Sequence, residues 1–353
     1  MPRKHFHSFD AFRFSAFFLV FLHHIPKKGN AFIDYFLKSG GIGVMFFFVL
    51  SGFLITYILL YEKEHKKTIS LKKFFARRIL RIWPLFYLMI AFAYLSPYLL
   101  HYFNISYENN GYKPDLLTSM LFAENYKMML TNSFPDGAPL RVMWSLCIEE
   151  HFYILWGILF YLIPTKKVPV LILVSILIAI ISRQIYTYLG ISPIDVFSHL
   201  DYFAFGAIPA YILMYKQQFI HYVESIPRYV KYIFLLLVIA VVFSMPNIDI
   251  VLLEPLYPLI LGVLFSITIL FTLGQNAIHI NDNLWISKLG IYTYGLYLYH
   301  TIIILLFVRI FKPLLDSNWY AFVAISLLAT IAVSAISYHL FEKQFLKLKR
   351  YFY

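Results

Sequence analysis

The stretch "VPVLILVSILIAII", residues 168–181, carries no charged side chain. Its length approaches the roughly 20 apolar residues that a helix needs to cross a bilayer. A second uncharged stretch, "YIFLLLVIAVVF", occupies residues 232–243, and 61% of the 353 residues are hydrophobic against 14% charged. A soluble domain cannot bury so much apolar surface. The sequence therefore predicts an all-α polytopic membrane protein.

Hydropathy, helix breakers and charge clusters together predict about ten transmembrane helices. Lys and Arg are concentrated in alternate connecting segments, with twenty on the side of the N-terminus and seven on the other side. This bias places both termini in the cytoplasm. The net charge of +12 is then mainly a topology signal, with a lesser role at anionic lipids, and no nucleic-acid partner is expected. The predicted spans lie near residues 8–25, 40–61, 83–102, 144–163, 168–188, 199–215, 231–245, 250–273, 286–311 and 318–341.

One membrane domain is expected over residues 1–345, followed by a short basic cytoplasmic tail at 346–353. The N-terminal segment lacks a small-residue cleavage site, so it predicts a retained first helix. Cys147 is the only cysteine, which excludes an internal disulfide or a cysteine-built metal site, and no metal is expected. The long outer segment 103–143 is expected to be mainly loop, with an apolar piece, "LLTSMLF", on or partly within the membrane.

Ionisable groups stand at both ends of "RFSAFFLVFLHH", residues 13–24. Arg13 and His24 are eleven residues apart, so on a helix they share nearly one face, separated by about 16 Å of rise. His23 points about 100° away from them. A charge inside a span usually faces the bundle interior, a partner or a water-filled cavity. The alternative is that Arg13 snorkels to the inner membrane interface and the histidines lie at the outer one.

Two further segments place charges near the membrane interior. "RRILRIWP" sets Arg78 and Arg81 three residues apart on one helix face, where they serve either as topology signals or as a phosphate clamp. "WSLCIEEHFYILW" puts Glu149 and Glu150 early in an apolar span, and at least one of them should face protein.

Three more features have an unremarkable structural explanation beside a functional one. Small residues in "GIGVMFFFVLSGFLIT" permit close helix approach, namely Gly41, Gly43, Ser51 and Gly52. Asp201 in "SHLDYFAFGAI" suits helix capping, and His300 in "LGIYTYGLYLYHTIIIL" suits a packed, hydrogen-bonded histidine.

Seven segments in this order resemble the landmarks of the acyltransferase-3 family of membrane acyltransferases. They are "FDAFRFSAFFLVFLHH", "GGIGVMFFFVLSGFLIT", "ARRILRIWPLFYL", "WSLCIEEHFYILW", "LDYFAFGAI", "LGIYTYGLYLYH" and "SYHLFEKQF". The resemblance implies a ten-helix domain that transfers an acyl group, commonly acetyl, from a cytosolic CoA thioester to a hydroxyl of a glycan or related acceptor. Its motifs fall on Arg13 and His24, on Arg78 and Arg81, and on Glu149. No permanently bound cofactor is implied, because acyl-CoA is a substrate.

The chain departs from the family pattern at three positions. His151 stands where a glutamine is common, Met143 where a histidine often precedes the "WSL" motif, and His199 where an arginine often precedes the aspartate. These replacements bear on the acceptor that the enzyme would select.

The hypothesis for chemistry assigns His24 as general base, because histidine titrates near neutral pH. Arg13, Arg78 and Arg81 would hold CoA phosphates, and Glu149 would orient or charge-balance the site. Acceptor contacts are expected from Asp201, His300 and Tyr153. A covalent acyl-histidine intermediate and a larger acyl group such as succinyl stay open. The competing classes are a transporter or flippase for a glycan or lipid-linked intermediate, and a non-catalytic membrane scaffold.

Overall fold

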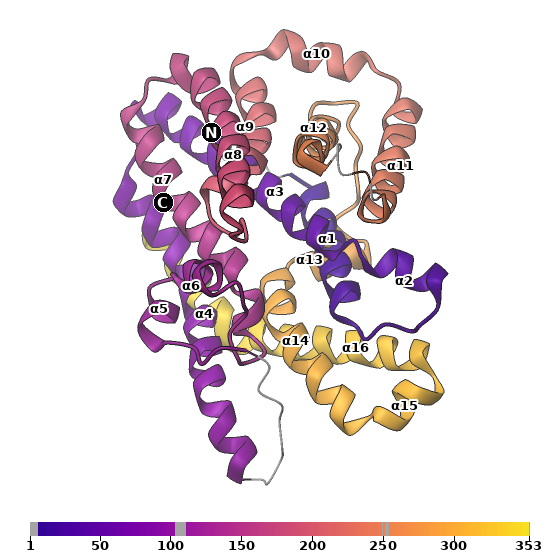
Figure 1. Ribbon diagram of the computed structural model, residues 1–353. Helices are drawn as coiled ribbons and strands as arrows, with labels where there is room; N and C mark the ends of the chain where they lie inside the picture. Colours follow the sequence, from indigo (N-terminus) through magenta and orange to yellow (C-terminus); the bar gives the residue numbers. More distant parts are fainter. Residues whose placement is uncertain (1–5, 103–110, 249, 251–253, 353) are drawn as a thin grey trace. The chain divides into compact units, whose positions relative to one another are not determined.

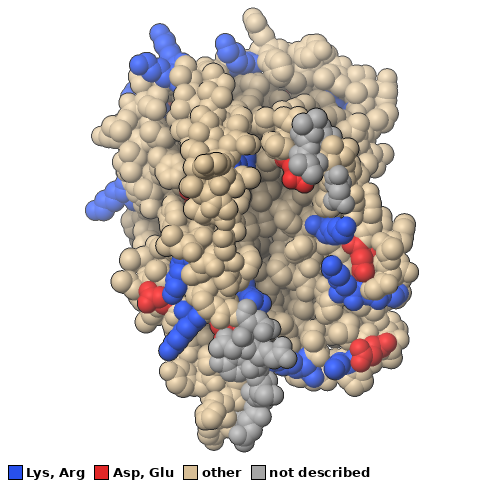
Figure 2. Space-filling model, in the orientation of Figure 1, with Lys and Arg blue, Asp and Glu red and all other residues tan. Residues whose placement is uncertain are grey.

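The computed structural model describes residues 6–102, 111–248, 250 and 254–352. Every regular element in these ranges is a helix, and an isolated bridge between Tyr112 and Pro135 is the one β-type pairing among them (Figure 1). Seven helical segments are long and apolar enough to cross a membrane, which makes the chain a multi-pass membrane protein. Wide areas of the face in Figure 2 carry no acidic or basic side chain, as expected of a lipid-facing surface.

A helix is present in each of the ten predicted spans. Three of these helices, α1, α9 and α12, have 17, 16 and 14 residues and are not among the seven segments long and apolar enough to cross a membrane. The number of spans therefore stays a prediction. The ten helices are α1 (Ser8–His24), α3 (Gly40–Lys66), α4 (Leu71–Tyr102), α7 (Trp144–Leu162), α8 (Val168–Leu189), α9 (Leu200–Tyr215), α11 (Arg228–Ser244), α12 (Tyr257–Leu270), α14 (Thr293–Ile310) and α16 (Trp319–Ser337).

Two of the helical regions differ from the simple picture of one helix for each span. The span expected at 286–311 is two helices, because α13 (Trp285–Gly290) ends at a glycine before α14 begins. The span expected at 83–102 lies within a longer helix, because α4 begins at Leu71 and includes the basic cluster on its first turns. The link from α3 is short because Lys67 adopts a left-handed conformation with φ of 61° and ends that helix.

The contacts divide the chain into two compact units. The first unit contains residues 1–69, 159–180 and 199–293, and the second contains 70–158, 181–198 and 294–353. Each is described separately below.

In the first unit, α3 packs closely on α9 and on α1 through glycines. A Cβ on Gly52 would strike the backbone of Phe203, and a Cβ on Gly206 would strike the carbonyl of Val49. Gly43 lies in the same way against the carbonyl of Ala16 in α1. The predicted close approach is thus confirmed at Gly43 and Gly52. It is wrong for Gly41, which has no neighbouring atom within 4 Å of such a Cβ.

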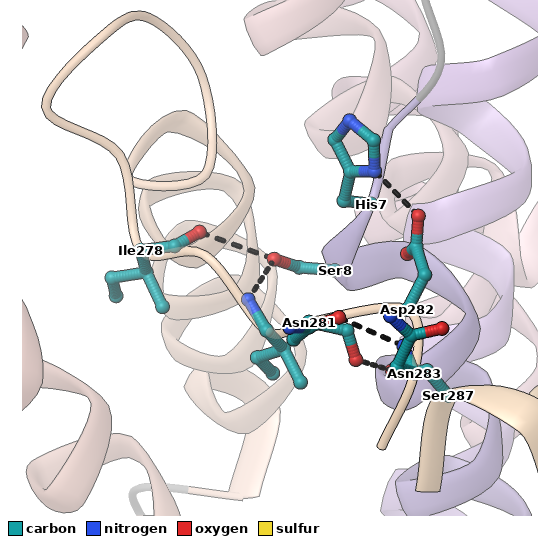
Figure 3. Close-up of polar contacts among 8 residues, drawn as sticks. His7, Ser8, Ile278, Asn281, Asp282, Asn283 and Ser287 are labelled. Carbon is teal, nitrogen blue, oxygen red and sulfur yellow. Dashed lines mark hydrogen bonds and ion pairs between the residues drawn. The ribbon is translucent and has the colours of Figure 1, made fainter. Parts of the chain in front are cut away.

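The N-terminal end of α1 is held by the loop before α13 (Figure 3). Ser8 Oγ donates to the Ile278 carbonyl and accepts from the Ile280 amide, both at 3.1 Å, and His7 pairs with Asp282. In α13 itself, Gly290 lies directly against the backbone of Asp10. The start of α1 is therefore fixed by backbone contacts on the side of α13.

In the second unit, α4 packs through aromatic side chains. Phe122 stacks on Phe86 with ring centroids 3.9 Å apart and lies 5.7 Å from Trp83. Gly157 leaves room for the ring of Phe74, which a Cβ would approach to 3.1 Å. Aromatic contacts of this kind bury large areas and fix ring geometry.

The segment after α4 contains more helix than expected. Its elements include α5 (Leu116–Met120), capped by the Asp115 carboxylate, and α6 (Glu124–Thr131). The amide of Thr118 donates to that carboxylate and lowers the pKa of Asp115. Glu124 accepts from Tyr112 Oη and Ser119 Oγ, and burial together with this carboxylate raises the pKa of Tyr112, which stays a donor.

The last described residues pack against α4. After α16 the chain continues as η6 (Tyr338–Glu342), α17 (Lys343–Lys347) and η7 (Leu348–Phe352), and all three contact α4. Arg77 donates to the Phe352 carbonyl at 2.6 Å. The residues expected to form a basic tail thus lie against the basic first turns of α4.

Candidate active site

In the first unit, Arg13 and His24 lie on one unbroken helix, α1, as the sequence predicts. Arg13 donates to the carboxylate of Asp10, one turn earlier. The carboxylate offsets the positive charge that an isolated arginine would present. Asp10 was not among the residues selected from the sequence, although a carboxylate three residues before an arginine is a recognisable pairing signal.

His24 is the last residue of α1, and its Nδ1 lies 2.9 Å from the Val20 carbonyl. A carbonyl oxygen only accepts hydrogen bonds, so Nδ1 must carry the proton in this contact. In the neutral ring, Nε2 is then the nitrogen with the lone pair. The helix therefore holds His24 in the tautomer that a general base at Nε2 requires.

His23 has a different environment. Its Nδ1 lies 3.1 Å from the Leu37 carbonyl, and its Cβ backs directly onto Gly40 at the start of α3. The imidazole of His23 thus connects α1 to α2 (Ala31–Leu37) and the first turn of α3. Since the two rings meet edge to face at 5.4 Å, His23 is a close structural neighbour and a matched control for His24.

Asp201 lies in the first turn of α9 and is fully buried. Its Oδ1 accepts from the Tyr202 amide at 3.0 Å, which satisfies a backbone donor at the helix start. Asp201 is the second residue of the helix, whereas the N-cap position belongs to His199, whose side chain forms no capping hydrogen bond, so Asp201 is not the N-cap. Contact with an acceptor substrate stays a prediction.

In the second unit, three of the predicted residues lie together. Tyr153 Oη donates to Glu149 Oε2 at 3.1 Å, one turn apart on α7. The Arg78 guanidinium lies over the Tyr153 ring at 5.8 Å from its centroid. A cation over an aromatic face is attracted by the ring quadrupole. Tyr153 therefore links the carboxylate of Glu149 to the guanidinium of Arg78.

Glu150 is the buried member of the carboxylate pair, as expected of at least one of them. Its Oε2 accepts from Trp83 Nε1 at 3.2 Å, whereas its Oε1 has no hydrogen-bond partner among the described residues. Trp83 lies two residues after Arg81 in "RRILRIWP" and was not selected from the sequence. The pairing joins residues 67 positions apart, which no local pattern reveals.

The two predicted arginines of α4 differ in exposure. Arg81 is exposed, and Arg78 is half-buried with its Nε enclosed and without a hydrogen bond in the described structure. Neither forms an ion pair with a described carboxylate. Two guanidinium groups without a counter-charge, one turn apart, are chemically suited to an external phosphate.

His300 is completely buried in α14. Its Nδ1 lies 2.6 Å from the Tyr297 carbonyl, which accepts the proton of that nitrogen. The environment agrees with the packed, hydrogen-bonded interpretation, and a role in acceptor binding stays a prediction. Over the described ranges, no three His, Cys, Asp or Glu side chains are grouped to hold a metal ion.

Comparison with known proteins identifies relatives that are named as O-acetyltransferases or putative O-acetyltransferases. The peptidoglycan O-acetyltransferase OatA of Listeria monocytogenes is 27% identical over 96% of this chain. The putative peptidoglycan O-acetyltransferase YrhL of Bacillus subtilis is 38% identical over 34% of the chain, and a putative O-acetyltransferase of Staphylococcus aureus is 31% identical over 42%. The matches cover 56%, 19% and 24% of these proteins, so the chain corresponds to only part of their length.

No solved structure matches the chain significantly. The model of the acyltransferase domain matches residues 6–339, a range that includes each of the predicted site residues from Arg13 to His300. With nearly the whole chain covered, the protein belongs to the acyltransferase-3 family.

Proposed function

We propose that the protein is an O-acetyltransferase of the bacterial cytoplasmic membrane. It transfers an acetyl group from cytosolic acetyl-CoA to a hydroxyl of a cell-surface glycan or of its lipid-linked precursor. Family membership supports the acyl chemistry, and the names of the relatives, which are O-acetyltransferases, support acetyl as the group and peptidoglycan as the class of acceptor. In this proposal the chain crosses the membrane ten times, with both termini in the cytoplasm.

The observation that carries the mechanism is the contact of His24 Nδ1 with the Val20 carbonyl. Nε2 of His24 accepts the proton of the acceptor hydroxyl while its oxygen attacks the thioester carbonyl. The C–O bond forms, the C–S bond breaks, and the imidazolium returns the proton to the CoA thiolate. One base therefore serves both halves of the transfer.

The charged residues hold the donor in this proposal. Arg13, Arg78 and Arg81 bind the phosphates of CoA, for which planar guanidinium groups are suited. Glu149 orients or charge-balances the site, and it accepts a hydrogen bond from Tyr153, whose ring lies under Arg78. Asp201, His300 and Tyr153 are assigned to the acceptor side.

The test is label transfer from radiolabelled acetyl-CoA to glycan by the full chain in membrane vesicles. A positioned general base contributes about 10²- to 10⁴-fold, so His24→Ala should lower transfer by at least about a hundredfold. His23→Ala is the control, because its ring contacts the Leu37 carbonyl and should affect stability more than transfer.

Full transfer by the His24→Ala protein would show that the base assignment is wrong. If even the wild-type protein labels no glycan but moves it across the vesicle membrane, the protein is a transporter instead.

A further inference from the structure

Lys349, in η7, lies among the arginines of α4. Burial, together with the nearby charges of Arg81, Arg78 and Arg77, lowers the pKa of its ammonium group. Lys349 is half-buried, and within the described ranges it forms neither a hydrogen bond nor an ion pair. A fourth basic side chain therefore joins three arginines that lie within five consecutive residues of one helix.

The position of Lys349 is fixed by the contacts of η7. Arg77 is almost completely buried, and it donates to the Phe352 carbonyl three residues beyond Lys349. Both α17 and η7 lie against α4 along this stretch. The ammonium of Lys349 is thus held beside the arginines by the fold of the chain around it.

Two carboxylates lie close enough to influence the cluster, but both are engaged elsewhere. Glu150 accepts from Trp83 Nε1 at 3.2 Å, and Glu342 accepts from Ser337 Oγ at 3.3 Å. The charge of Glu150 acts on Arg78, and that of Arg81 acts on Glu342, yet no ion pair forms between them. The carboxylates in range thus leave three cations without a directly bound counter-ion, namely Arg78, Arg81 and Lys349.

A cluster of basic groups without a directly bound counter-ion is unfavourable in the protein without a ligand. Like charges held close together repel, and the repulsion is strongest where burial lowers the effective dielectric constant. A multivalent anion reverses the sign of this energy, because each cation then gains a charge-assisted hydrogen bond. The end of CoA that carries a diphosphate and a separate 3′-phosphate is a ligand of this kind.

We propose that Lys349 is a donor-binding residue and that, with Arg78 and Arg81, it binds the phosphates of the CoA thioester. This inference rests on the proposed function, since it takes acetyl-CoA as the donor. It adds η7 to the donor site, a segment that the sequence motifs do not include.

The test is CoA binding to the full chain in lipid nanodiscs. Pantetheine, which is the thiol arm of CoA without its phosphates or nucleotide, is the comparison ligand. Loss of a charge-assisted hydrogen bond weakens binding by about ten- to a hundredfold. We expect Lys349→Met and Arg81→Met to weaken CoA binding to this extent and to leave pantetheine binding unchanged. Lys349→Arg should keep most of the affinity. Lys347→Met is the matched control, because that lysine is exposed and bonds only to Gln344.

Thermal stability separates a binding role from a structural one. Relief of like-charge repulsion should raise the melting temperature of the unliganded Lys349→Met protein by a few degrees, whereas added CoA should stabilise it less than the wild type. A lower melting temperature for the unliganded variant would make Lys349 a structural residue and overturn the inference.

The outcomes also separate this inference from the proposed function. Unchanged CoA binding by Lys349→Met, together with weakened binding by Arg81→Met, would overturn the role of Lys349 and leave the donor assignment standing. If wild-type protein binds CoA no more tightly than pantetheine, the donor assignment itself is wrong.

Discussion

Helices α1 and α4 both carry arginines that the sequence selects for phosphate binding, but they balance these charges differently. On α1, Arg13 pairs with Asp10 one turn away. On α4, Arg78 and Arg81 form no ion pair with any described residue, and the adjacent carboxylate of Glu150 is hydrogen-bonded to Trp83. The α1 arginine is thus neutralised within its own helix. We therefore expect the α4 arginines to bind an anion from outside the chain more tightly than Arg13 does.

The two helices also differ in how they pack. Helix α1 meets α3 and α13 backbone to backbone, at Gly43 and Gly290. Helix α4 is surrounded by rings, such as Phe122 stacked on Phe86. Glycine contacts leave little freedom for displacement, because the atoms that would have to move belong to the main chain. The position of His24 at the end of α1 is therefore set by the backbone.

The largest expected effect is on this backbone packing. A Gly290→Val side chain would overlap the main chain of Asp10 in α1, which cannot yield as a flexible side chain would. We expect a loss of about 3 kcal/mol or more in stability. The measurement is the melting temperature and the monodisperse fraction of protein in detergent.

Gly41→Val is the control for this substitution, because a Cβ there meets no atom within 4 Å. Equal melting temperatures for the two variants would mean that α1 is not fixed by its glycine contacts, and the comparison of packing would fail.

Much of this architecture is predictable from sequence because hydropathy is a local property. Each of the ten apolar segments contains a helix, and the prediction of close approach at Gly43 and Gly52 is confirmed. The helical setting predicted for Arg78 and Arg81 is also present, although α4 begins earlier than the apolar span, at Leu71. The break after Gly290 was missed because the apolar run continues through it.

The candidate site is only partly predictable, since its contacts join distant positions. The link from Tyr153 to Glu149 spans one helical turn and follows from spacing. The bond from Trp83 to Glu150 joins residues 67 apart, and that from Arg77 to Phe352 joins residues 275 apart. Only the tertiary fold brings such groups together. The basic character of the final segment was visible in the sequence, but its place beside α4 was not.

The next effect concerns the neutralised arginine. Asp10→Asn keeps an oxygen that can accept from Arg13 but removes the negative charge. Arg13 would then lose the negative charge of the carboxylate with which it pairs. We expect CoA to bind about tenfold more tightly, which corresponds to about 1.4 kcal/mol, and the measurement is a CoA titration in nanodiscs.

Arg13→Met in the same background is the control, and it should abolish the gain. Weaker CoA binding by Asp10→Asn alone would show that Asp10 positions Arg13 for the phosphate instead of neutralising it. In that case α1 and α4 would not differ in the way their charges suggest.

The smallest expected effect tests whether the hydrogen bond from Trp83 keeps the carboxylate of Glu150 from pairing with the α4 arginines. Trp83→Phe keeps an aromatic ring beside Phe122 but removes the donor to Glu150 Oε2. Side-chain hydrogen bonds within membrane proteins contribute about 0.6 kcal/mol on average, so we expect a loss of stability of about 1 kcal/mol or less. CoA affinity should change by less than about twofold, because the carboxylate is already near Arg78 and only its hydrogen bond is lost.

A tenfold loss of CoA affinity would mean that Trp83 keeps Glu150 from pairing with Arg78. The absence of a counter-ion on α4 would then depend on this one indole, not on the arrangement of the helix.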